Sequence, residues 1–407
     1  MIDLFRQYDA AYNQFTFYDG EPDQQVLQVG LTGMFRLGDG GTPLGRKRIA
    51  GVFNYFHKQF GQHLKYGYFT DPNRLLKYGA KAMVEKQKQI LSQNGGDLEF
   101  SWKSGDDHEL VNKYQFSVYS PAQWFQDIHQ SVSVVYFYIP LQTLKDNAID
   151  FDEWIRFFCE ILQPLSGFFG LALQQCYERY RYQHIEFEVA QKFLGLHIIT
   201  GGWDKEFRDG IDSVNWYTFF NRNWLNQLGG EAALKHTLND ERIKMLPYEG
   251  GMIIKAGELP ELGWIEEDPY PELYVKVNHA LKPIRAPKIE SLGYGSIAGE
   301  IRFNDRTTAE WLTRFDNAPL PPETTVPPTV QRENLSENRV FIMRESGEIA
   351  PHSGLWATLQ NGVSEYLEID ENTVIPEWLN KRDNKMYKTT WTLIRREDGG
   401  DCTVPSN

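Results

Sequence analysis

The most recognisable chemical motif is a glycine-rich turn, LGDGGTPLGRK, from Leu37 to Lys47. A turn of this kind between a strand and a helix can hold phosphate on the N–H groups of the helix N-terminus. This one lacks both the GxGxxG spacing and the GK[ST] ending, and the carboxylate of Asp39 would repel a phosphate. We therefore assign no nucleotide or other cofactor to it and expect a plain strand–turn–helix unit.

The histidines and cysteines form no local metal or nucleophile motif. The nine histidines include no HxH or HExxH pair and accompany no CxxC motif, and these are spacings that zinc sites use. No GxSxG elbow is present, and neither Cys159 nor Cys176 has the sequence context of a catalytic cysteine. His197, in the apolar run Leu194–Ile199, is expected to be a hydrogen-bonded core histidine. We predict no metal and no catalytic residue, while a site assembled from distant residues stays open.

Carboxylates are the more informative residues. Between positions 201 and 272 there are fourteen acidic residues against seven basic ones. The densest part, GELPELGWIEEDPYPE, alternates acids with prolines and aromatics, a composition that suits a protein-docking loop. The candidate docking residues are Glu258, Glu261, Trp264, Glu266, Glu267, Asp268, Tyr270 and Glu272. The simpler alternative is a solvated loop whose aromatics belong to the core.

The overall charge and the cysteine content set limits on partners and compartment. The net charge of −13 disfavours direct binding to nucleic acid or to an anionic membrane and favours a partner with a basic surface. Three cysteines, Cys159, Cys176 and Cys402, fit free thiols in a reducing compartment. The sequence opens without a signal-peptide pattern, so we expect a cytoplasmic protein. The most apolar stretch, residues 154–173, contains Arg156, Glu160 and Pro164 and is expected to be a buried helix, not a membrane span.

The elements that must position these residues follow from local patterns. Thr42 and Pro43 predict the start of a helix that runs to Phe60, and Phe53, Phe56 and Phe60 share its core face. Further helices are expected over 71–93 and from 151 after the cap Asp150, and strands over 26–37, 98–102, 115–119 and 131–139, with a hairpin over 244–256. No strict βαβ alternation occurs, so the predicted class is α+β, with mixed or antiparallel sheets and packed helices.

A proline-rich segment divides the chain. Residues 316–330, DNAPLPPETTVPPTV, hold five prolines and no periodic apolar face, which predicts a semi-extended linker. The expected domains are an α+β domain over 1–315 and a small, mostly β module over 331–407.

Five segments, taken in order, resemble a known family. They are VGLTGMFRLGDGG with FNYFHKQFG, KFLGLHIITGGWD, WLNQLGGEAAL, EGGMIIKAGELPELG, and YVKVNHALKPIR, which together span about 26–285. They resemble the type VI secretion system immunity family. The resemblance implies a protein without catalytic activity that neutralises a secreted toxin. For some members of the family the implied toxin is a nuclease, including nucleases of the VRR-Nuc type. The family has no catalytic motif to transfer to this chain.

The residues after the linker resemble a small module attached to proteins of antibacterial secretion clusters. The pattern consists of Gly347, Pro351 with Gly354 and Trp356, and then Pro376 and Trp391. Related tails often carry a Cys before the first proline, where this chain has Ala350, so any role of that Cys is lost. No function is assigned to the module.

The resulting hypothesis is an immunity protein that binds a cognate type VI secretion toxin with a basic surface, expected to be a nuclease, and blocks its active or substrate-binding surface. Two alternatives stay open. One is a hydrolase or transferase with a scattered site, which would show a pocket with strongly shifted pKa values. The other is an adaptor that loads the toxin onto the secretion apparatus, which would be needed for secretion and not for survival.

Overall fold

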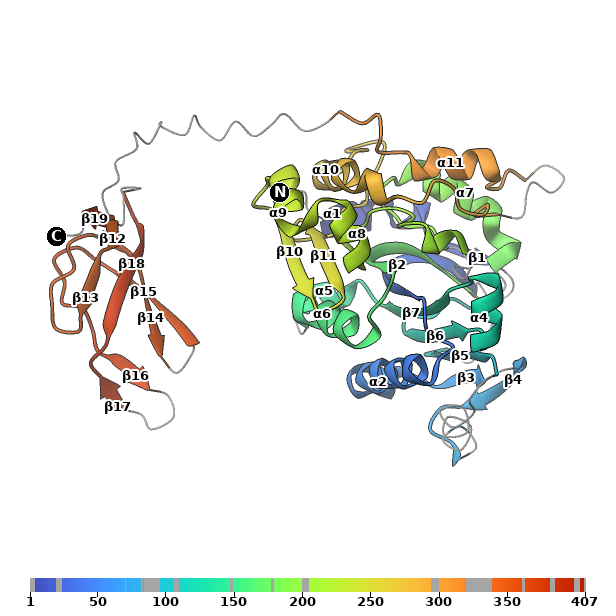
Figure 1. Ribbon diagram of the computed structural model, residues 1–407, viewed down its shortest axis with the longest axis horizontal. Helices are drawn as coiled ribbons and strands as arrows, with labels where there is room; N and C mark the ends of the chain where they lie inside the picture. Colours follow the sequence, from blue (N-terminus) through green and yellow to red (C-terminus); the bar gives the residue numbers. More distant parts are fainter. Residues whose placement is uncertain are drawn as a thin grey trace. The chain divides into compact units, whose positions relative to one another are not determined.

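A computed structural model describes residues 4–19, 24–69, 71–81, 83, 96–105, 110–146, 149–176, 179–199, 205–293, 300–319, 339–360, 363–380, 385–398 and 403–405. The chain divides into two compact units, residues 1–323 and 324–407 (Figure 1). The predicted linker falls mostly in residues 320–338, outside the described residues, so its boundaries stay a prediction.

The larger unit is built on one 11-stranded sheet, and all of its described strand pairs are antiparallel. This confirms the predicted α+β class with antiparallel pairing. In spatial order the strands are β10 (Ile243–Tyr248), β11 (Gly251–Ala256), β9 (Tyr217–Asn221), β8 (Ser166–Gln175), β2 (Gln24–Leu37), β7 (Ser133–Ile139), β6 (Gln115–Ser120), β5 (Leu98–Lys103), β3 (Tyr66–Phe69) and β4 (Asp71–Lys77), with β1 (Phe17–Asp19) paired to β2.

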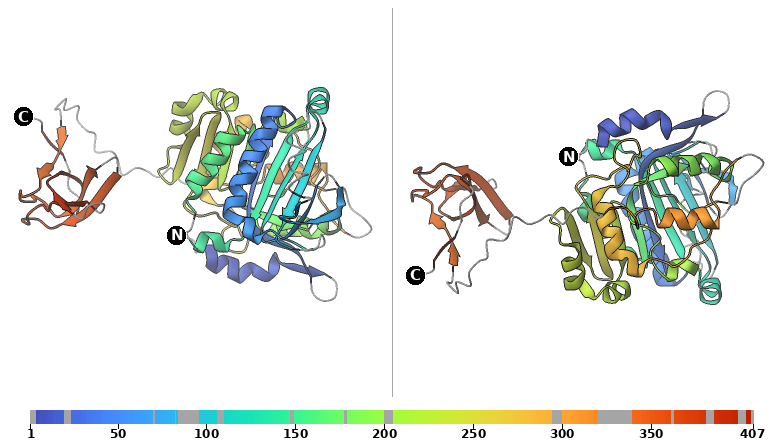
Figure 2. Two further views of the ribbon diagram at one scale, coloured as in Figure 1. Left: turned by 90° about the horizontal axis from the view of Figure 1, so that it is seen from below. Right: turned by 90° about the horizontal axis from the view of Figure 1, so that it is seen from above.

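Two long helices, α2 (Pro43–Phe60) and α6 (Phe151–Leu162), cover one face of this sheet (Figure 2). Both start as the sequence predicts. The side chain of Thr42 accepts a hydrogen bond from the N–H of Gly45, and that of Asp150 accepts one from the N–H of Glu153. Their apolar faces bury aromatic side chains, including the expected Phe53, Phe56 and Phe60.

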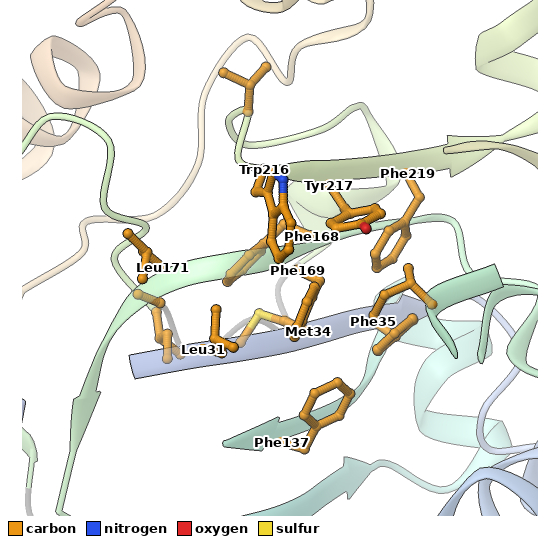
Figure 3. Packing of buried hydrophobic residues seen from close by; sticks show 14 of the residues in the cluster. Leu31, Met34, Phe35, Phe137, Phe168, Phe169, Leu171, Trp216, Tyr217 and Phe219 are labelled. Carbon is orange, nitrogen blue, oxygen red and sulfur yellow. The ribbon is translucent and has the colours of Figure 1, made fainter. Parts of the chain in front are cut away.

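The core beneath these helices is predominantly aromatic. The ring of Phe35 on β2 stacks on Phe219 of β9, with centroids 4.7 Å apart, and on Phe158 of α6 at 5.4 Å (Figure 3). Phe137 of β7 lies opposite Gly33, where an added Cβ would come within 2.3 Å of its ring. Because Gly33 has no Cβ, the ring of Phe137 can lie directly over this position of the sheet.

The opposite face is covered by α7 (Gln183–Lys192), α10 (Glu272–Leu281) and α11 (Asp305–Leu312) (Figure 2). The remaining helices connect strands or flank the sheet: α1 (Leu4–Ala11), α4 (Gln123–His129), α5 (Gln142–Lys145), α8 (Arg222–Gln227) and α9 (Gly230–Leu238). No helix among the described residues has both the length and the apolarity that a membrane crossing needs.

Two predictions about elements are wrong. The helix expected over 71–93 begins as strand β4, because Lys77 pairs with Tyr66 and Leu76 with Gly67 in a hairpin with β3; residues 84–93 lie outside the described part. The apolar stretch 154–173, expected to be one buried helix, is helical only as far as Leu162 in α6, and from Ser166 it forms the fully buried strand β8. A strand buried on both faces has a continuous apolar sequence that resembles a buried helix.

The smaller unit is mostly β, as predicted. Its four-stranded antiparallel sheet has the order β13 (Met343–Glu345), β18 (Thr390–Arg396), β14 (Gly354–Gln360) and β15 (Val363–Ile369), beside two pairs, β12 (Arg339–Phe341) with β19 (Thr403–Pro405) and β16 (Trp378–Asn380) with β17 (Lys385–Tyr387). Trp356 and Trp391 form its core, and the indole N–H of Trp391 donates to the carbonyl of Pro376. Ala350 is also buried there.

Candidate functional site

The acidic segment predicted from the sequence is the connection between β11 and α10, which we call the acidic loop (residues 257–272). Backbone hydrogen bonds fix it to the end of α7 and the segment that follows: the N–H of Leu194 donates to the carbonyl of Gly263, that of Gly195 to Leu262, and that of Ile265 to Lys192. An added Cβ at Gly195 would lie 2.2 Å from the carbonyl oxygen of Glu261. The loop therefore has a defined conformation, set by contacts with residues about seventy positions earlier.

The two aromatic candidates have different positions. Trp264 is only 7% exposed, pairs with Phe193 through a β-bridge and packs on its ring at 6.0 Å. Tyr270 is 39% exposed. Ile265, which was not among the predicted residues, is 47% exposed. The chain turns directly after Trp264, whose carbonyl accepts hydrogen bonds from the N–H groups of Glu267 and Asp268, and Ile265 lies on the exposed part of this turn. Tyr270 and Ile265 are thus the large apolar groups that the loop presents to solvent.

Glu267 connects the acidic loop to helix α1. Its Oε2 atom accepts hydrogen bonds from Arg6 Nη2 at 3.0 Å and from Gln7 Nε2 at 2.8 Å. These two donors lower the pKa of the Glu267 carboxyl below its ordinary value. Arg6 is 261 positions away in sequence, so this neutralisation could not be read from the local composition.

Glu272, the last acid of the loop, is neutralised as well. It pairs with Arg242, which also contacts Asp240 at 2.8 Å. Lys276 lies 3.3 Å from the same Asp240 carboxylate. Hydrogen bonds from Arg242 lower the pKa of Glu272 and bring that of Asp240 to about 2. The end of the loop is therefore a compensated network.

Glu261 differs from the other acids. Burial, followed by the neighbouring charges of Asp268 and Glu272, raises the pKa of its carboxyl to about 7. Its backbone N–H donates to the hydroxyl of Tyr274 at 3.3 Å. Near neutral pH this carboxyl carries only part of a negative charge.

Three acids keep uncompensated or weakly compensated charge. Glu266 is exposed and Asp268 is half-buried, and within the described residues neither side chain makes an ion pair or hydrogen bond. The side chain of Glu258 is 78% exposed and lies 4.0 Å from Lys255, whose Nζ is closer to Asp152 at 2.9 Å. The eight predicted residues thus lie on one loop, and the negative charge it presents comes mainly from Glu258, Glu266 and Asp268.

A second polar cluster lies under the other face of the sheet. Arg36 of β2 donates from Nη2 to Oδ2 of Asp212 at 2.6 Å, and His197 Nε2 lies 3.0 Å from the same oxygen. The guanidinium of Arg36 also lies 3.9 Å above the ring of Phe207. The expectation that His197 is a hydrogen-bonded core histidine is confirmed. Its partners Arg36 and Asp212 could not be predicted from any local pattern.

Burial sets the chemistry of this cluster. The side chains of Arg36 and His197 are 0% exposed. Burial lowers the pKa of His197, while Arg36 and His197 hold the pKa of Asp212 well below its ordinary value. The cluster is therefore a neutral imidazole beside a buried ion pair, with no solvent access for a substrate, and its role is structural. No group of three or more His, Cys, Asp or Glu among the described residues is placed to hold a metal ion.

Comparisons with known proteins identify the chain's relatives. The family model described as type VI immunity for VRR-NUC, TsiV, matches residues 48–315. Among solved structures, the Pseudomonas aeruginosa T6SS protein PA0821 is similar, with a TM-score of 0.67 and 26% identity over 76% of this chain and 86% of that one. A search of curated proteins found no match. The family model covers more than half of the residues, including most of α2, the strands from β3 to β11 and the acidic loop. This chain therefore belongs to the TsiV family of type VI immunity proteins for VRR-NUC effectors.

Proposed function

We propose that this protein neutralises a VRR-NUC effector by covering the effector's nucleic-acid-binding surface with the acidic loop. A nuclease must hold phosphates, so its substrate groove is positively charged. Carboxylates presented there compete for the same field and also accelerate the encounter of the two proteins. The observation that carries the proposal is that a loop fixed by backbone hydrogen bonds still directs Glu258 and Glu266 into solvent.

The exposed apolar groups of the loop provide the second part of the interface. Tyr270 and Ile265 lie on either side of the exposed acids Glu266 and Glu267 in sequence. Large apolar side chains surrounded by polar ones are the usual centres of binding energy in protein interfaces. Trp264 supports the interface indirectly: its buried ring packs on Phe193 and holds the loop in its conformation. We assign no turnover to the protein, and we place its action in the cytoplasm, where a nuclease would meet its substrate.

The test is inhibition of the cognate effector's nuclease activity by the purified full chain. The double variant Glu266→Gln with Asp268→Asn should inhibit with an association rate lower by about tenfold at low salt, and the difference should shrink as salt rises. The matched control is Asp127→Asn with Glu249→Gln. It removes the same charge from α4 and from the β10–β11 turn, at the opposite end of the sheet.

Three results would contradict the proposal. They are failure of the wild-type chain to bind or inhibit the effector, equal association rates for the two double variants, and turnover by the pure protein that one substitution abolishes. A chain needed for effector secretion but not for survival would instead favour the adaptor.

A further inference from the structure

A hollow of about 280 Å³ lies beside helix α1, at the same end of the sheet as the acidic loop. Its polar and aromatic lining includes Phe5, Tyr8, Asp9, Gln28, Lys113 and Lys145. Pockets for small-molecule ligands generally measure about 300–1,000 Å³. This hollow is at the lower limit of that range, so it has room for about one protein side chain.

Hydrogen bonds hold the walls of the hollow in place. Gln25 Nε2 donates to Gln28 at 2.9 Å, Gln28 Nε2 donates to Gln174 at 2.8 Å, and Gln174 Nε2 donates to the carbonyl of Leu31 at 2.9 Å. The hydroxyl of Tyr8 donates to the carbonyl of Val29 at 3.2 Å. A wall fixed in this way loses little conformational entropy when a partner's side chain enters.

The charge of the hollow is opposite to that of the chain as a whole. Two lysines line it against one carboxylate, that of Asp9. Neither Lys113 nor Lys145 has an ion pair within the part of the chain that the structure describes. The ammonium of Lys145 lies 4.6 Å from the centroid of the Phe5 ring, in the hollow's wall. An anionic group entering there would gain two cations for which the described residues supply no ion-pair partner.

The hollow and the acidic loop lie on the two sides of one helix. Arg6 and Gln7 of α1 hold Glu267 of the loop, and the other face of the helix, with Phe5, Tyr8 and Asp9, lines the hollow. An α-helix with its side chains is about 10–12 Å across. From β11, where the loop starts, to β2 there are three strand spacings, or about 14 Å. Both features therefore fit within one interface of about 800 Å² per partner.

We propose that this hollow receives a carboxylate side chain of the effector, bound between Lys113 and Lys145, while the acidic loop contacts the effector's basic surface. The inference rests on the proposed function and adds an element of specificity to it. A uniformly basic effector surface could bind the carboxylates of the acidic loop in many relative positions of the two proteins. One acidic side chain at a fixed place among basic ones defines a single register, and a partner with a cation there is repelled.

The experiment measures binding of the full chain to the cognate effector with an inactivated nuclease site. The variant Lys113→Glu with Lys145→Glu should bind about tenfold or more weakly, mainly through faster dissociation. The control is Lys47→Glu with Lys205→Glu, which makes the same change in net charge. These two exposed lysines lie on α2 and on the short 3-10 helix Lys205–Arg208, at the other end of the sheet. This control should change the affinity less than about threefold.

A third variant gives the sign of the bound charge. Asp9→Asn should leave the affinity unchanged or increase it, because Asp9 opposes an incoming carboxylate. Replacing the effector's acidic residues one at a time should identify one whose effect disappears in the lysine double variant, as a direct contact requires. Equal affinity of the lysine variant and its control, or weaker binding of Asp9→Asn alone, overturns the inference and leaves the proposed function intact. Absence of wild-type binding overturns both. Melting temperatures equal to that of the wild type exclude misfolding in each variant.

Discussion

Replacing Asp212 by Asn tests how much the buried ion pair with Arg36 matters for stability. Oδ1 of Asp212 accepts the backbone N–H of Ser213 at 2.8 Å, and an asparagine oxygen can keep this bond. The substitution would exchange Oδ2 for an NH2 group that faces Nη2 of Arg36 and, 3.0 Å away, Nε2 of His197. The change is therefore confined to the charge and to its two hydrogen-bond partners.

The expected loss is large because the guanidinium of Arg36 is 0% exposed and would stay charged without a counter-ion. Breaking a buried pair in this way generally costs about 3–5 kcal/mol. The comparison is Asp39→Asn, which breaks an Arg–Asp pair of nearly the same length, 2.7 Å, between side chains that are 26% and 40% exposed. An exposed pair is worth about 0–1 kcal/mol, so the two variants separate the effect of burial from that of distance.

The assay is calorimetry and urea unfolding of the full chain, following the transition of the larger unit. The pH dependence provides a second observable. The folded pKa of His197 lies below its unfolded value, so the unfolded state binds a proton first and wild-type stability falls as pH drops below about 6.5. The folded pKa of Asp212 is also lowered, so its contribution is present above about pH 4 and is lost at lower pH. A cost below about 1 kcal/mol for Asp212→Asn, equal to that of Asp39→Asn, would refute the reasoning.

Three further predictions concern other parts of the larger unit. Glu261→Gln should stabilise the protein by about 1–2 kcal/mol more at pH 8 than at pH 5, because the raised pKa of this carboxyl makes the folded state lose stability as pH rises through 7; equal unfolding free energies at both pH values would contradict this. In the full chain, Asp316→Asn should lower the unfolding free energy by about 2 kcal/mol, because it removes the carboxylate charge that Arg285 contacts at 2.6 Å; unchanged stability in urea would show that this pair contributes nothing. Gly33→Ala should lower the unfolding free energy by about 1–3 kcal/mol, because its Cβ would meet the ring of Phe137, and an unchanged melting temperature would count against that contact.

The elements that the sequence predicted correctly depend on nearby residues. The start of α2 depends on Thr42 and Pro43, that of α6 on Asp150, and the β10–β11 hairpin on two apolar runs around Glu249 and Gly250. Helix caps and tight turns are decided within about four residues, so the chain needs no tertiary contact to specify them. The order of the expected strands and helices likewise predicted the α+β class, and the local composition predicted the position of a charged loop.

Tertiary structure alone decided which strands form and which charges are compensated. Strand β4 exists because residues 71–77 pair with β3, and strand pairing overrides local helix signals. Asp212 is buried beside Arg36, 176 positions away, and Glu267 is neutralised by Arg6, 261 positions away. Residues brought close by folding determine how much charge a loop presents. They also determine whether an aromatic ring of the loop faces the core or the solvent. A count of acids along the sequence therefore locates the acidic loop, but the fold determines that Glu258, Glu266 and Asp268 remain uncompensated there while Trp264 is buried.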